Sequence, residues 1–138
     1  MLSEFVNAES FPVGIGVDCV CISELRALDE RTVGAFVSRT FTPEEIRLSE
    51  EAADKWCFLA GRFAVKEAVF KALAPLTKEK FFDYRRVETR KQSDGSPVIS
   101  PDSVPAEAMV QAGADRLLVS ITGEGDFALA FVQAVKVR

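Results

Sequence analysis

The sequence predicts an α+β domain in which a mostly antiparallel sheet packs on one long central helix. Residues 56–73 contain no proline, and their apolar residues recur at helical spacing. Residues 116–122 and 127–137 have the composition of strands, and the short polar loop between them is typical of a hairpin. Helix-like and strand-like segments are mixed along the chain, which favours α+β over the other classes.

The N-terminal part predicts an extension followed by a buried strand. We expect residues 1–12 to form the extension and residues 13–138 to form a single domain. The domain begins with the sequence VGIGVD, an apolar strand that is expected to stop at Asp18. Glycines inside a strand indicate close approach by another backbone or by a ligand. Asp18 is suited equally to metal binding and to capping a helix, and the residues alone leave both open.

Two helices are expected before the long one. Ser23 is predicted to cap a helix of moderate length that exposes Arg26 and Arg31. Thr42 and Glu45, with a proline just after the threonine, match a capping box at the start of the next helix. The capping role alone accounts for these residues, so they do not indicate a catalytic or binding function.

The long helix is expected to begin near Asp54 and to end near Pro75, because proline cannot continue it. Beyond it, residues 84–91 alternate enough for a strand, and the sequence SDGSP predicts a turn into a short strand at Val98 and Ile99. A short helix over residues 101–111 should end at Gly113.

The last strand alternates in a way that predicts which of its faces packs on the core. Its large apolar residues recur at every second position, and we expect that face to be buried. The residues concerned are Phe127, Leu129, Phe131 and Val135.

Four charges on the long helix stand out because its other residues are apolar or small on nearly every side. Arg62 and Lys66 are a like-charged pair four residues apart, which is unfavourable unless an anion lies between them. Glu67 and Lys71 are an oppositely charged pair at the same spacing. Glu67 and Lys71 could form a plain ion pair along the helix, and Arg62 and Lys66 could lie on a solvated edge. Alternatively the four side chains bind a ligand, because charges on a buried helix need partners.

Composition excludes several classes of protein. The net charge is −4 and no long basic run occurs, which argues against a nucleic-acid partner. No apolar run reaches the roughly 20 residues of a membrane span, and no signal peptide is evident, so we expect a cytoplasmic protein. The chain has no histidine, which excludes a Ser-His-Asp triad and a histidine-ligated metal. Cys19, Cys21 and Cys57 are expected to be buried reduced thiols.

Five segments together resemble the holo-acyl-carrier-protein synthases, the small bacterial type of 4'-phosphopantetheinyl transferase. The similarity runs from about residue 13 to residue 137, and its most specific parts are the strand and the long helix. In chain order the segments read VGIGVD, FTPEE, FLAGRFAVKEAVFKA, SDGSP and LVSIT. The resemblance implies the 4'-phosphopantetheinyl transferase-like fold and Mg²⁺-dependent transfer of phosphopantetheine from coenzyme A to a serine of an acyl carrier protein.

The resemblance also implies roles for individual residues. Asp18 and Glu67 match the family's two metal-binding carboxylates, and Glu67 is also the candidate base for the serine proton. Arg62 and Lys66 match cationic positions near the coenzyme A phosphates. Lys71 matches the lysine that contacts the coenzyme and stabilises or protonates the departing phosphate oxygen.

One position departs from the family pattern. The family usually has a histidine after the Ser-Ile-Thr strand, and this chain has Gly123 there. The alternative function is therefore a non-catalytic module that binds coenzyme A or a carrier protein and has lost turnover.

The resemblance implies partners as well. It implies a homotrimer with active sites between subunits, and an acidic carrier protein as substrate. Because this chain is acidic overall, docking would need a local basic patch, for which Arg26, Arg31 and Arg39 are the candidates.

Overall fold

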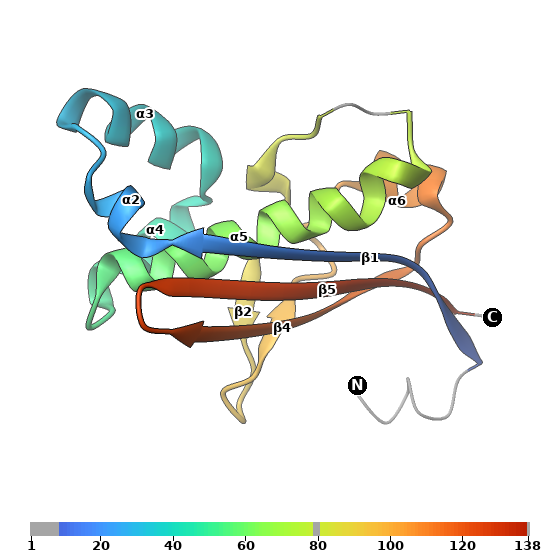
Figure 1. Ribbon diagram of the computed structural model, residues 1–138. Coiled ribbons are helices and arrows are strands. Elements are labelled where there is room, and N and C mark those ends of the chain that lie inside the picture. Colours follow the sequence, from blue (N-terminus) through green and yellow to red (C-terminus); the bar gives the residue numbers. More distant parts are fainter. Residues whose placement is uncertain (1–8, 79–80, 138) are drawn as a thin grey trace.

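The computed structural model describes residues 9–78 and 81–137 of the 138-residue chain, and it confirms the α+β class (Figure 1). One long helix, α5, lies against a three-stranded antiparallel sheet, and shorter helices and a two-stranded sheet surround it. In chain order the elements are β1 (Ser10–Cys21), α2 (Ile22–Arg26), α3 (Glu30–Thr40), α4 (Pro43–Glu51), α5 (Lys55–Leu73), the 3-10 turns η1 (Ala74–Leu76) and η2 (Tyr84–Arg86), β2 (Thr89–Lys91), β3 (Pro97–Ile99), α6 (Ala106–Ala112), β4 (Arg116–Glu124) and β5 (Phe127–Val137).

The main sheet has the strand order β1-β5-β4, so the last strand of the chain lies between the first strand and its own hairpin partner. β1 and β5 pair antiparallel with Asp18 opposite Ala130, and β4 pairs with β5 through the predicted hairpin. The second sheet joins β2 to β3 across the predicted SDGSP turn. No helix in the described part of the chain is both long and apolar enough to cross a membrane.

The contact between β1 and α5 depends on the two glycines of the first strand. A Cβ atom added at Gly14 would lie 2.2 Å from the carbonyl oxygen of Ala72, and one added at Gly16 would lie 1.9 Å from that of Ala68. The predicted close approach by another backbone is therefore confirmed. The strand itself is longer than expected: it continues past Asp18 to Cys21, because its pairing with β5 does not end at the carboxylate.

The close packing of α5 on the sheet also decides which face of β5 is buried, and it is the opposite face to the one predicted. Ala128, Ala130, Val132 and Ala134 are the residues that face the core, with at most 4% of their surface exposed. Of the predicted core residues, Val135 alone is buried, whereas Phe127, Leu129 and Phe131 are 36–51% exposed. The helix approaches the sheet so closely that small side chains fill the space, and the aromatic face is turned outward.

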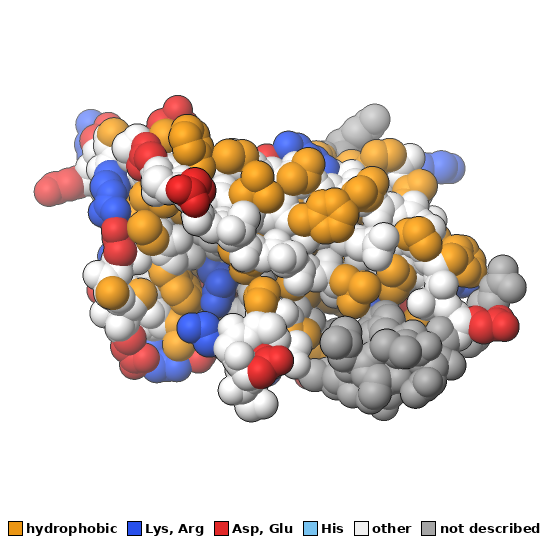
Figure 2. All heavy atoms as spheres, turned by 60° about the horizontal axis from the view of Figure 1, so that its bottom comes forward, with side chains coloured by type: hydrophobic (Ala, Val, Ile, Leu, Met, Phe, Trp, Pro, Cys, Tyr) orange, Lys and Arg blue, Asp and Glu red, His pale blue; other side chains and the backbone are white. Residues whose placement is uncertain are grey.

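The large apolar residues of β5 therefore belong to an exposed face, which we call the outer sheet face. It consists of Ile15 and Val17 of β1 together with Phe127, Leu129 and Phe131 of β5. Val17 lies opposite Phe131 in the register, so the two strands form one surface. Hydrophobic side chains gather in a band across the side of the molecule shown in Figure 2. An apolar surface of this kind usually marks a contact with another molecule.

The long helix starts and stops as expected. The Asp54 carboxylate accepts hydrogen bonds from the backbone N–H groups of Trp56 and Cys57, and the helix ends in η1, which contains Pro75. The capping box of α4 is also confirmed, since Thr42 and Glu45 exchange backbone-to-side-chain hydrogen bonds.

Other local predictions were wrong or incomplete. The single helix after Ser23 is two short helices, α2 and α3, and the Ser23 hydroxyl donates to Asp126 (2.6 Å) instead of capping α2. The predicted strand over residues 84–91 is a 3-10 turn followed by three strand residues. The cysteines are free, but Cys19 and Cys57 are exposed where burial was expected. Of the predicted extension, residues 10–12 belong to β1 and residues 1–8 lie outside the described residues.

Candidate active site

Asp18, Glu67 and Lys71 meet where β1 crosses α5. Alternate residues of a strand share a face, so Asp18 is on the same side as Gly16, which touches α5. Lys71 Nζ lies 2.8 Å from Asp18 Oδ1 and also donates to the carbonyl oxygen of Val17 (3.1 Å). The structure therefore pairs Lys71 with Asp18, and not with Glu67 as a plain helix ion pair would require.

Charge and burial perturb the groups of this cluster. Burial, together with the nearby Asp18 carboxylate, raises the pKa of Glu67, while the Tyr84 hydroxyl and the Lys71 ammonium act in the opposite direction. The hydrogen bond between Lys71 and Asp18 raises the pKa of Lys71. Lys71 stays half-exposed, at 52% of its side-chain surface, so its ammonium can leave Asp18 for an incoming anion.

The donor set of this cluster suits magnesium. Within residues 9–78 and 81–137, no group of three or more His, Cys, Asp or Glu residues is placed to enclose a metal. Asp18 and Glu67 nevertheless provide two carboxylates close enough for one to raise the pKa of the other. Mg²⁺ is usually held by one or two carboxylates, with substrate phosphates and water completing its shell, so the two residues fit this ion.

Lys66 lies elsewhere, in a buried ion pair. Its Nζ is 2.8 Å from Glu45 Oε1, and each side chain is 1% exposed. The same ammonium donates to the carbonyl oxygens of Tyr84 (2.8 Å) and Val87. An ammonium has three protons to donate, and these three partners use them all. This burial contradicts the expectation that Lys66 meets a coenzyme A phosphate: the anion beside it is Glu45.

Arg62 is also buried, with 9% of its surface exposed. Its guanidinium lies over the ring of Phe58, 4.4 Å from the ring centre, and its Nε has no hydrogen-bond partner among the described residues. Burial lowers the pKa of Arg62, while the charge of Glu45 acts in the opposite direction. Because this N–H group has no partner to give up, it can donate a hydrogen bond to an anion at little cost in free energy.

Tyr84 is the residue of this region that the sequence did not reveal. Burial and the nearby Glu67 carboxylate raise the pKa of its hydroxyl, and its backbone carbonyl accepts a hydrogen bond from Lys66. It is the only tyrosine in the chain and had been assigned to a strand. The cluster of aromatic residues before it was the one available signal.

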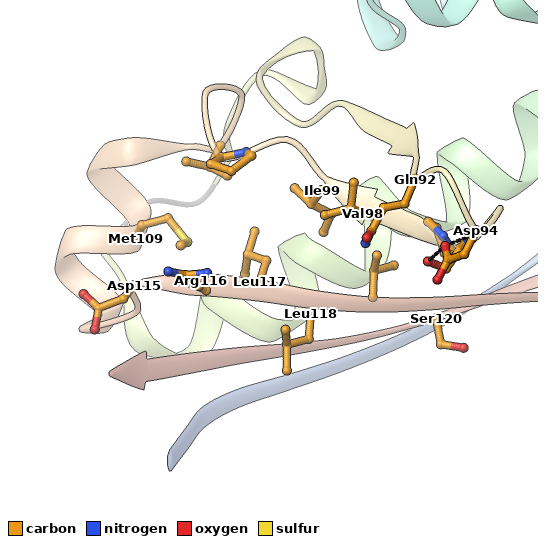
Figure 3. Close-up of a pocket in the computed structure, with 15 residues that line it drawn as sticks. Gln92, Asp94, Val98, Ile99, Met109, Asp115, Arg116, Leu117, Leu118 and Ser120 are labelled. Carbon is orange, nitrogen blue, oxygen red and sulfur yellow. Dashed lines mark hydrogen bonds between the residues drawn. The ribbon is translucent and has the colours of Figure 1, made fainter. Parts of the chain in front are cut away.

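Two hollows open elsewhere on the described part of the protein. A mostly apolar pocket of about 670 Å³ opens between β3, β4 and α6, where Ile99, Met109 and Leu117 point toward one another (Figure 3). A smaller one of about 330 Å³ is lined by Gly123 and Cys57 at the β4–β5 hairpin and the first turns of α5. None of Asp18, Glu67 and Lys71 lines either pocket.

The three arginines proposed for docking lie on the first two short helices. Arg26 forms an ion pair with Asp54, the residue that caps α5. Arg31 and Arg39 are exposed on α3, and neither has an ion-pair partner among the described residues.

Comparison with known proteins agrees with this fold. Residues 14–132 match the model of the 4'-phosphopantetheinyl transferase superfamily. The chain is 36% identical to the holo-[acyl-carrier-protein] synthase of Thermodesulfovibrio yellowstonii over 86% of its length and 95% of the relative's. It is 37% identical to that of Desulforudis audaxviator over 89% of its length and 92% of the relative's.

Solved structures lead to the same family. The holo-[acyl-carrier-protein] synthase of Neisseria meningitidis superposes with a TM-score of 0.76 at 29% identity, covering 90% of this chain and 98% of that one. The Helicobacter pylori enzyme, solved in complex with coenzyme A, gives a TM-score of 0.70 at 31% identity, covering 90% and 99%. The chain therefore belongs to the 4'-phosphopantetheinyl transferase superfamily, among the holo-[acyl-carrier-protein] synthases.

Proposed function

We propose that the protein transfers 4'-phosphopantetheine from coenzyme A to a serine of an apo-acyl carrier protein. The products are the holo carrier protein and adenosine 3',5'-bisphosphate. The observation that carries this proposal is the meeting of Asp18, Glu67 and Lys71 at the β1–α5 crossing, in a chain of this family. A module that merely binds has no need of two neighbouring carboxylates and a half-exposed ammonium beside them.

The reaction breaks the bond between the phosphorus that carries pantetheine and the oxygen that stays with adenosine bisphosphate. Asp18 and Glu67 would hold Mg²⁺, which neutralises the pyrophosphate and makes this phosphorus more electrophilic. Glu67 accepts the proton of the attacking serine hydroxyl, a role favoured by its raised pKa. Lys71 leaves Asp18 and donates to the departing phosphate oxygen. Arg62 stays a candidate for the coenzyme A phosphates, whereas buried Lys66 does not.

Transfer can be tested by the mass of a bacterial apo-acyl carrier protein after incubation with this protein, coenzyme A and Mg²⁺. We expect a gain of one phosphopantetheine group, which a chelator abolishes. Glu67→Gln should lower the rate at least ~100-fold, because it removes the base and one metal ligand. Glu107→Gln, at an exposed position of α6, is the matched control and should keep the full rate. A Glu67→Gln rate equal to that of the control would contradict the proposal.

The alternative, a binding module without turnover, rests on Gly123. A Cβ at this position would meet the carbonyl oxygen of Phe127 at 3.7 Å, an ordinary contact, so Gly123→His introduces no clash at that atom. If the natural protein binds coenzyme A but leaves the carrier mass unchanged, and Gly123→His restores transfer, the alternative holds. Transfer by the natural protein rejects it.

The carrier protein is proposed to dock on the arginines of α2 and α3. Charge reversal at Arg26 would place a carboxylate beside Asp54 and weaken the start of α5, so Arg31 and Arg39 give the cleaner test. Changing both to glutamate should raise the KM for carrier protein several-fold and leave the KM for coenzyme A unchanged. Equal effects on both constants would argue against this docking site.

The protein is further proposed to act as a homotrimer in the cytoplasm. Support for assembly comes from the outer sheet face, whose residues Ile15 and Val17 are 63% and 50% exposed. Three unpaired cysteines suit a reducing compartment. A sedimentation mass of one chain at micromolar concentration would oppose the trimer.

A further inference from the structure

The buried ion pair between Lys66 and Glu45 holds a particular piece of backbone. Lys66 lies on α5 and Glu45 on α4, and the ammonium between them also binds the carbonyl oxygens of Tyr84 and Val87. Those two carbonyls bracket the 3-10 turn η2, so one side chain fixes both ends of this turn against the long helix. Glu67 is the next residue along α5.

The side chain of Tyr84 is fixed as firmly as its backbone. Its ring makes edge or tilted contacts with Phe63 and Phe82, at centroid distances of 6.3 and 5.6 Å, and it stacks on Phe81 at 6.2 Å. Aromatic pairs at these distances have preferred orientations, so the ring cannot turn freely. Phe63 lies one turn before Glu67 on α5, so this contact places Tyr84 on the same face of the helix as Glu67, where the two side chains interact.

We propose that Tyr84 is a positioning residue for Glu67, and that the buried Lys66–Glu45 pair acts on the site by holding Tyr84 in place. This assignment rests on the proposed function for Glu67.

The arrangement matches the general behaviour of metal-binding carboxylates. Such carboxylates are themselves hydrogen-bonded by neighbouring groups, and loss of the neighbour typically weakens metal binding or activity 10- to 100-fold. Tyr84 suits this task better than a surface residue would, because its position depends on a buried ion pair and on a packed aromatic cluster. A hydroxyl held in this way loses little conformational entropy when the metal binds.

The test is Tyr84→Phe, which removes the hydroxyl and keeps the ring. Mn²⁺ affinity is measured by electron paramagnetic resonance with coenzyme A present and carrier protein absent, so that no turnover occurs. We expect Mn²⁺ affinity to fall roughly 10-fold or more, coenzyme A affinity in chelator to stay unchanged, and the melting temperature to move by only a few degrees. Ser38→Ala removes a hydroxyl on α3 and should leave Mn²⁺ affinity unchanged.

Two outcomes separate this inference from the proposed function. Natural Mn²⁺ affinity in Tyr84→Phe, together with a natural kcat, would overturn the role of Tyr84 and leave transfer by Glu67 intact. If the natural protein binds Mn²⁺ but never modifies a carrier protein, the proposed function fails, while a weakened Tyr84→Phe site would still support the positioning role.

Discussion

Alanine at Gly16 is expected to lower the free energy of unfolding by about 3 kcal/mol or more, or to prevent folding. The added Cβ would lie 1.9 Å from the carbonyl oxygen of Ala68 and 2.8 Å from the backbone nitrogen of Ala72. Both neighbours are helix backbone, which cannot rotate away as a side chain can. β1 and α5 would have to separate, and a typical domain has only ~5–15 kcal/mol of stability to lose. Urea unfolding followed by circular dichroism measures the change.

Gly34→Ala is the matched control for this prediction. Gly34 lies inside α3, its φ angle is negative, and a Cβ there would meet nothing within 4 Å. Alanine should therefore stabilise the protein by about 0.5–1 kcal/mol through its better helix propensity. If both substitutions change stability equally, the close packing of β1 on α5 is wrong.

Methionine at Lys66 is expected to cost about 3–5 kcal/mol of stability. The substitution leaves Glu45 as a charge inside the protein, with its remaining oxygen already lacking a hydrogen-bond partner. It also leaves the carbonyls of Tyr84 and Val87 without their donor. Thermal and urea unfolding of the variant give the free energy directly.

A double substitution identifies the cause of this loss. Glu45→Gln keeps a residue that can complete the capping box of α4 and removes the buried charge. Lys66→Met with Glu45→Gln should therefore be less destabilised than the sum of the two single variants. Lys55→Met breaks an exposed ion pair with Glu50 and should change stability by less than ~1 kcal/mol. Additive single effects would show that the pair is not coupled.

The sequence allowed prediction of the features that depend on local pattern. The bounds of α5 followed from its unbroken periodicity and from Asp54 and Pro75, and the capping box of α4 followed from residue types at fixed spacing. The glycines of β1 indicated a close approach, which proved to be that of α5. Asp18, Glu67 and Lys71 were named through the resemblance to a family, and the structure brings them together.

Other features depend on contacts between distant segments, which local pattern does not encode. Lys66 and Glu67 are adjacent in sequence, and nothing local indicates that Glu45, in another helix, would enclose one of them. The exposed face of β5 was mistaken for its core face, because hydrophobicity alone favours phenylalanine inside and the narrow gap beside α5 admits alanine. The helix α3 was missed since its buried surface is slight.

The single ammonium that joins α4, α5 and η2 has a consequence for how the protein fails when heated. Many enzymes lose activity before they unfold, because their reactive groups lie on loosely held loops that open first. Here Glu67 follows directly after the residue that fastens three segments together, and Asp18 lies on a strand sealed against the same helix. We therefore expect no local unfolding that disrupts the cluster before the whole domain unfolds. Inactivation and global unfolding should share one temperature.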